Sequence, residues 1–150
     1  MKKWKELLWI FIPLVVLTIA DFVTILWSYL RPHPELPADF TYTLSDPELW
    51  INVCHGALFV PVLCTVLFAL PLGLVVRWLP LSRRMKYVLL FSGAVLCVGL
   101  LFFFTGLHMR VFKWYNILHC AHIGSTVVFF VWLAECVWTA VKRLIQGAKQ

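Results

Sequence analysis

The chain has 150 residues, of which 62% are hydrophobic and 13% are charged. Soluble domains are about half apolar, so this composition excludes an ordinary water-soluble fold and predicts a protein that lies in lipid. The formal net charge is +6. The basic residues stand at the ends of apolar runs, without a basic face or a nucleic-acid-binding motif, and this pattern argues against a nucleic-acid partner.

Four apolar runs are each long enough to cross the hydrocarbon core of a bilayer, which is roughly 30 Å thick and takes about 20 helical residues. Within lipid the backbone must satisfy its own hydrogen bonds, so the runs are predicted to be helices. The predicted fold class is therefore all-α, a single domain (1–150) that forms an integral membrane four-helix bundle. The predicted helices are 7–30, 50–79, 87–109 and 115–141, and residues 31–49 form an outer loop.

Lysine and arginine predict the orientation of these helices, because cytoplasmic loops are enriched in both residues. Ten of the 13 basic residues fall at the two termini or between the second and third helices, and three fall on the other side. Both termini are therefore expected in the cytoplasm. The expected location is a bacterial inner (cytoplasmic) membrane, with the lipid bilayer around the helices.

The second and fourth helices open with the same pattern, W-x-N-[VI]-x-H-x-A, at a constant offset of 64 residues. One copy carries Asn52 and His55, the other carries Asn116 and His119, and the chain has no further asparagine. Both helices run inward from the outer face, so the pattern predicts a parallel two-helix pseudo-repeat, a kind of symmetry known in membrane proteins. The two histidines would then lie at equal depth near the outer face.

Two histidines that face each other across a bundle can hold one planar haem through axial imidazoles. The repeat therefore predicts one b-type haem near the outer face, with His55 and His119 as iron ligands, if both face the axis. Asn52 and Asn116 precede these histidines by one turn and are expected to orient the imidazoles or to contact the haem propionates.

Three more polar residues are candidates in the same region. His122 lies one turn deeper than His119, and His108 ends the third helix; either could replace the chosen ligand, contact a propionate or serve a quinone. Asp21 lies within the first helix, roughly 13 Å from its outer end, where a carboxylate is costly unless paired. We interpret Asp21 as a proton or quinone site, with a structural hydrogen bond to Thr18 or to a neighbouring helix as the alternative.

The chain resembles the b-type cytochrome membrane subunits that anchor quinone-linked respiratory formate dehydrogenases and hydrogenases. The shared features are a helical bundle with histidines near helix ends, and Thr105-Gly106-Leu107 at one helix end followed by a helix with His119 and Gly124. The resemblance implies an electron-transfer subunit that passes electrons between quinone and a partner redox subunit through haem b. Such subunits often hold a second haem near the opposite face. No histidine lies near the cytoplasmic helix ends here, so one haem and a partner on the outer side are expected.

Two alternatives to this electron-transfer subunit remain open. A metal-binding membrane protein, either a transporter or an intramembrane metalloenzyme, would need several outer histidines to converge on zinc or copper. Its candidate ligands are His55, His108, His119 and His122. A cofactor-free structural anchor subunit would keep its partner complex after loss of His55. In the electron-transfer interpretation the chain is a non-catalytic subunit of a larger oxidoreductase complex, because the redox chemistry belongs to the haem.

Overall fold

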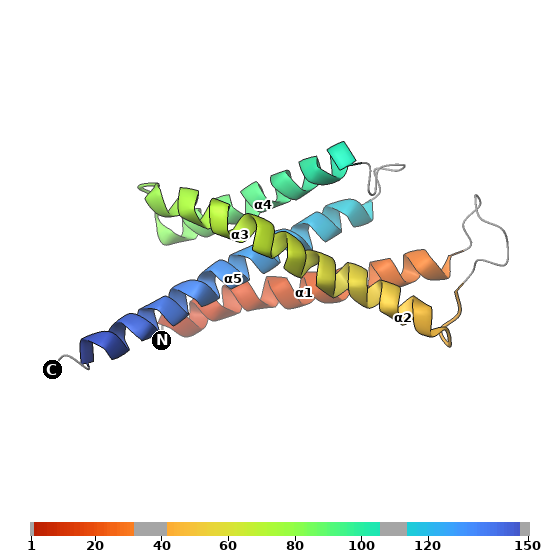
Figure 1. Cartoon of the computed structure of the whole chain (residues 1–150), viewed down its shortest axis with the longest axis horizontal. Helices are drawn as coiled ribbons and strands as arrows, with labels where there is room; N and C mark the ends of the chain where they lie inside the picture. The colour runs from red at the N-terminus through yellow and green to blue at the C-terminus, as the bar shows by residue number, and fades with distance from the viewer. Residues whose placement is uncertain (1, 32–41, 106–113, 148–150) are drawn as a thin grey trace.

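The computed structural model describes residues 2–31, 42–105 and 114–147, and every regular element in these ranges is a helix (Figure 1). In chain order the elements are α1 (Lys2–Leu30), α2 (Pro47–Cys54), the π-helical segment η2 (His55–Phe59), α3 (Val60–Trp78), α4 (Arg83–Thr105) and α5 (Trp114–Gly147). The elements α2, η2 and α3 follow one another without a break and form one long rod. The predicted all-α class is therefore confirmed for the described residues.

Four helical segments are long and apolar enough to cross a membrane. They are Lys5–Leu30, Pro47–Trp78, Arg83–Phe104 and Asn116–Gly147. Large apolar side chains such as Trp9, Leu70 and Phe104 are exposed on their outer surfaces, and lipid is the solvent that suits such surfaces. The chain is thus an integral membrane protein. The start of α1 and the end of α5 lie at the same end of the molecule (Figure 1). The side of the membrane that this end faces stays a prediction.

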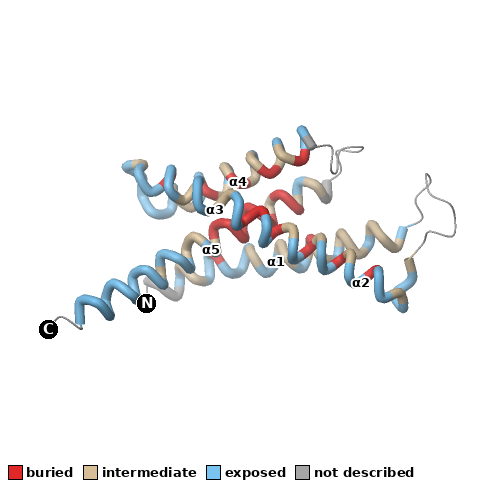
Figure 2. Tube along the Cα trace, in the orientation of Figure 1, coloured by how far each residue is buried: buried red, intermediate tan, exposed pale blue. Residues whose placement is uncertain are grey.

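Several helix boundaries differ from the predicted ones: α1 begins at Lys2 and not at residue 7, and α4 begins at Arg83 and not at residue 87. The predicted end of the third helix, residue 109, lies outside the described residues. The rod formed by α2, η2 and α3 begins at Pro47 and not at residue 50. Proline fits the first turn of a helix, where its missing N–H costs no hydrogen bond. Asp46 precedes it in extended backbone, and its carboxylate accepts a hydrogen bond of 2.6 Å from the Thr43 N–H. At the other end of the chain, α5 continues past the predicted residue 141 to Gly147, and its last turns are exposed (Figure 2).

The π-helical segment η2 lies between α2 and α3, just before Pro61. In this segment the Val60 N–H bonds to the His55 carbonyl, five residues back. Pro61 follows; it has no N–H, and its ring crowds the carbonyl four residues earlier in a regular α-helix. One wider turn before Pro61 accommodates both effects, and it also changes the face that α2 presents relative to α3. Pro71 by contrast lies inside α3, which continues past it.

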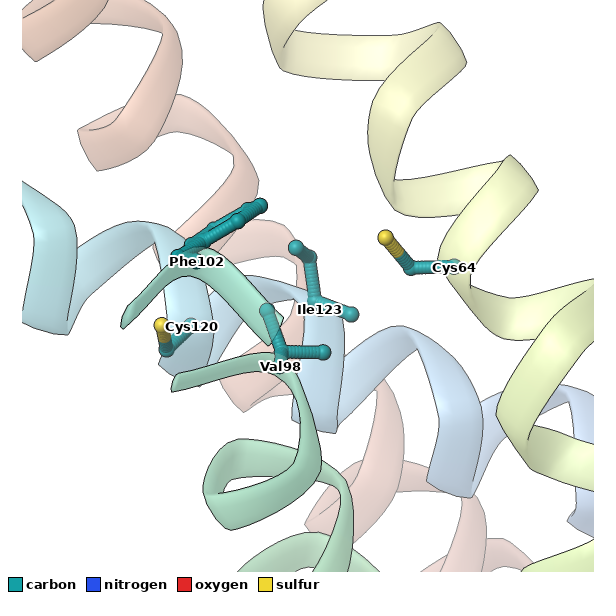
Figure 3. Close-up of a cluster of buried hydrophobic side chains, with 5 residues drawn as sticks. All are labelled: Cys64, Val98, Phe102, Cys120 and Ile123. Carbon is teal, nitrogen blue, oxygen red and sulfur yellow. The ribbon is translucent and has the colours of Figure 1, made fainter. Parts of the chain in front are cut away.

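The helix α5 is the centre of the bundle, because it packs against α1, α3 and α4. Residues 122–128 are buried around its whole circumference (Figure 2). Two apolar clusters surround it. The first is made of Cys64, Val98, Phe102, Cys120 and Ile123 (Figure 3), and the second of Ile10, Val76, Leu90 and Val128. The neutral thiols of the first cluster act as small apolar groups that fill the core.

Gly124 sets how closely α4 and α5 approach. A Cβ atom at this position would lie 2.8 Å from a methyl carbon of Val95 and 3.2 Å from the main-chain oxygen of Phe91. Small residues at such crossings let helices pack closely in membranes. Lipid is as apolar as the side chains, so the hydrophobic effect does not drive helix association there. This close approach lies two residues after His122 in the same helix.

Candidate metal centre

A carboxylate of α1 and two imidazoles of α5 meet in the interior of the bundle. The Oδ2 atom of Asp21 lies 2.7 Å from Nδ1 of His119 and 2.8 Å from Nδ1 of His122. Residues three apart share a helix face, so both rings of α5 reach the same carboxylate oxygen. All three residues are buried, and Asp21 retains 1% of its accessible surface.

Two neighbours hold the imidazole rings in position. The hydroxyl oxygen of Thr18, one turn before Asp21 on α1, lies 2.9 Å from Nε2 of His122. Both nitrogens of the His122 ring are therefore in hydrogen bonds. The ring of Phe102, from α4, stacks on the His119 imidazole with 5.8 Å between ring centroids and 14° between planes. Side chains from α1, α4 and α5 thus build the site together.

The second carboxylate oxygen of Asp21, Oδ1, is buried and has no hydrogen-bond partner in the part of the chain that the structure describes. Buried polar atoms are nearly always paired, and an unpaired acceptor costs free energy. The cost is larger for a carboxylate inside a membrane-spanning segment. This oxygen can therefore accept a hydrogen bond or a cation from a group outside the described residues.

The donor atoms suit a particular class of metal ion. One carboxylate oxygen and one nitrogen from each histidine lie within 4.8 Å of one another. Imidazole nitrogen favours zinc, iron, nickel and copper, whereas magnesium and calcium prefer sites made of oxygen alone. The site therefore fits a divalent transition-metal ion better than a hard cation.

The residues of the predicted haem site lie in different environments. His55 is exposed at the start of η2 and stacks on Phe59, with ring centroids 4.9 Å apart, so the structure does not bring it into the cluster around Asp21. Asn52 donates a hydrogen bond of 3.4 Å to the hydroxyl of Tyr42, and Asn116 is half-buried in the first turn of α5. The haem between His55 and His119 and the pseudo-repeat behind it stay predictions.

The remaining candidates divide between this cluster and the undescribed residues. His122 and Asp21 belong to the cluster, and His108 lies outside the described residues. From sequence, Asp21 is predicted as a proton or quinone site and not as a metal ligand, because the repeated pattern singles out His55 and His119. Two features of the sequence could have predicted this cluster. His119 and His122 have i, i+3 spacing, and Asp21 is the one acidic residue inside the first apolar run.

Comparison with known proteins gives no match: no family model, no curated protein and no solved structure is significantly similar to this chain. The resemblance to b-type cytochrome subunits therefore remains a prediction from short motifs. The function has to be inferred from the chemistry of the site itself.

Proposed function

We propose that the protein binds a divalent transition-metal ion within the membrane, through Asp21, His119 and His122. One observation carries this proposal. A buried carboxylate meets two imidazole nitrogens through Oδ2, while its Oδ1 has no hydrogen-bond partner among the described residues. A cation held by this group would place positive charge beside both oxygens.

A purely structural hydrogen-bond cluster explains less of the geometry. Two N–H groups that donate to Oδ2 account for the distances of 2.7 and 2.8 Å, but they leave the buried Oδ1 of Asp21 without a partner among the described residues. A structural cluster also does not require both imidazoles to present the same ring nitrogen, Nδ1, to one carboxylate. The three possible ligand atoms lie within 4.8 Å of one another, close enough to bind one metal ion together.

Loading an ion would need a small movement of the side chains. Metal–nitrogen bonds are about 2.0–2.1 Å long, so neighbouring ligands of a tetrahedral ion stand roughly 3.3 Å apart. The two imidazoles would then move away from the carboxylate oxygen by about half an ångström, which rotation of side chains can supply. Three protein ligands are typical of sites that keep a coordination position for water or a substrate, whereas closed structural zinc sites use four.

The electron-transfer hypothesis places haem b, and not a single metal ion, in this bundle. The haem would lie between His55 and His119 and exchange electrons with quinone. It predicts a visible absorption spectrum that a zinc or iron site with these ligands lacks. It also makes His55 essential, whereas the metal site does not use this residue.

A single preparation separates these hypotheses. The full-length protein, purified in detergent with an affinity tag free of histidine, is analysed for bound metals by mass spectrometry and for haem by absorption before and after dithionite. We expect about one transition-metal ion per chain in the wild type, and its loss in Asp21→Asn and His122→Gln. His55→Gln is the matched control, because this histidine is exposed and should leave the metal content unchanged.

Other outcomes would overturn the proposal. Metal content that is equal in wild type and Asp21→Asn, both monodisperse and helical, would show that the cluster is not the site. A Soret band with sharp reduced α and β bands that disappears in His55→Gln would instead support the cytochrome hypothesis. A protein with neither metal nor haem, after growth with both supplied, would favour a cofactor-free anchor.

A further inference from the structure

One face of α1 carries six large apolar side chains that the rest of the described chain leaves more than half exposed. They are, in order, Trp9, Ile12, Val16, Ile19, Val23 and Trp27. Each follows the one before it by three or four residues, and residues at these spacings lie on the same face of a helix. We call these six residues the exposed stripe of α1.

The two ends of the exposed stripe are tryptophans, and the residues between them are aliphatic. Trp9 is 80% exposed and Trp27 is 59% exposed. The two are five helical turns apart and therefore lie on the same side of α1, separated by about 27 Å along the helix axis. The hydrocarbon core of a bilayer is roughly 30 Å thick, and tryptophan is enriched at both of its interfaces with water. The separation of the two rings therefore fits the distance between the two interfaces.

A cation lies one turn beyond each tryptophan. Lys5 precedes Trp9 by four residues and Arg31 follows Trp27 by four, and both cations are exposed. Neither forms an ion pair within the described ranges. The Arg31 guanidinium carbon is 5.4 Å from the centre of the Trp27 ring, a cation–π distance. Lysine and arginine near the ends of membrane helices extend their charges to the headgroups, so the negative phosphates of the two leaflets suit these two ends.

We infer that phospholipid, and not a partner protein, covers the exposed stripe of α1, with Trp9 and Trp27 at the two interfaces of the bilayer. The order along the stripe is cation, tryptophan, aliphatic residues, tryptophan and cation, which is the order of polarity across a bilayer. A protein interface favours a different order, because its most important residues, tryptophan among them, cluster near its centre. Here the centre is purely aliphatic, as contact with acyl chains requires.

This placement of α1 also gives the depth of Asp21 and of the two histidines in contact with it. Asp21 lies six residues from Trp27 and twelve from Trp9, which is about 9 Å and about 18 Å along the helix. The cluster therefore lies in the leaflet that surrounds the Trp27 end of α1. The depth follows from α1 alone and does not depend on whether a metal ion binds. A partner subunit would have to dock on a surface other than the exposed stripe.

The experiment measures the depth of each ring in full-length protein labelled with fluorotryptophan, in nanodiscs of a phosphatidylcholine with a hydrocarbon core of roughly 30 Å. Trp9→Phe and Trp27→Phe assign the two ¹⁹F resonances. A nitroxide is attached to the lipid either at the headgroup or at the end of an acyl chain. We expect the headgroup nitroxide to broaden both resonances more than the chain-end nitroxide does. Ile19→Trp is the matched control: its added resonance, near the middle of the stripe, should show the opposite ranking.

Two results would overturn the inference. If neither nitroxide broadens the resonances of Trp9, Trp27 and the added tryptophan, protein covers the stripe, and the mass of the particle in sedimentation would show whether a second copy is present. If the chain-end nitroxide broadens the Trp9 or Trp27 resonance more strongly, that ring does not lie at an interface. Val16→Trp supplies a second position near the middle of the stripe should Ile19→Trp fail to fold. Metal content does not enter any of these measurements, so the proposed metal site stands or fails independently.

Discussion

Asp21 and His122 are 101 residues apart in the chain, yet Oδ2 of the first and Nδ1 of the second are 2.8 Å apart in the bundle interior. This contact joins the first helix to the last. Burial of apolar surface gives helices little reason to associate in lipid, so packing and polar contacts decide how they fit together. The hydrogen bonds of Asp21 are therefore expected to hold α1 against α5 at one register.

The first prediction concerns the stability that Asp21 supplies without metal. Asp21→Ala leaves the buried imidazoles of His119 and His122 without their common acceptor, and each such loss typically costs about 1–3 kcal/mol. Asp21→Asn keeps a carbonyl oxygen that can accept, so it should cost less. Thermal unfolding of the metal-free protein, followed by circular dichroism in detergent, measures both. An equal midpoint for wild type and Asp21→Ala would contradict the role of Asp21 in helix association.

The second prediction tests the close approach of α4 and α5. The Cβ atom in Gly124→Ala would meet Val95 and the Phe91 main-chain oxygen, and overpacking of this kind costs about 1–3 kcal/mol. The control is Gly99→Ala, because no atom lies within 4 Å of a Cβ at that helical position. This control should be neutral or stabilising by up to about 1 kcal/mol, since alanine favours helix more than glycine does. Thermal midpoints that rank the two variants in the opposite order would refute the packing argument.

The third prediction concerns an ion-pair network at the end of the bundle where the chain begins and ends. Arg83 of α4 lies 3.0 Å from the carboxylate of Glu6 on α1 and 3.2 Å from that of Glu135 on α5, and its Nε donates to the Tyr87 hydroxyl at 3.0 Å. The side chains are roughly half exposed, and exposed ion pairs contribute about 0–1 kcal/mol.

Arg83→Gln is therefore expected to lower the thermal midpoint slightly in dilute buffer and hardly at all at 1 M salt, where the Debye length falls to about 3 Å. Arg84→Gln serves as the control: Arg84 is an exposed neighbour with no ion pair among the described residues. A salt-independent effect of Arg83→Gln would mean that its contribution is packing and not charge.

The fourth prediction concerns orientation. The excess of lysine and arginine at the ends of the chain and between the second and third helices predicts that both termini lie in the cytoplasm. A green fluorescent protein fused after Gln150 should fluoresce in bacterial cells, and alkaline phosphatase fused after Phe40 in the first outer loop should be active. The reverse pattern would place the Asp21 cluster nearer the cytoplasmic face.

The four membrane-crossing helices were predictable from the sequence, because run length and apolar content alone select helices in lipid. The candidate residues His119, His122 and Asp21 were also identifiable, since polar groups inside such runs are rare and costly. Sequence reasoning did less well at helix ends, where Pro47 and Gly147 lie beyond the apolar runs. Hydropathy does not specify where a helix ends once the helix extends beyond the lipid.

Tertiary structure alone decided which of these polar side chains meet. The repeat made His55 and His119 look equivalent, but one is exposed at a π-helical turn and the other is buried in a regular helix. That difference depends on which helices pack around α5, and no local sequence pattern encodes this packing. The contacts of Asp21 with α5 span about a hundred residues. They exist because α1 and α5 are neighbours, and helix adjacency is a property of packing that composition and periodicity do not specify.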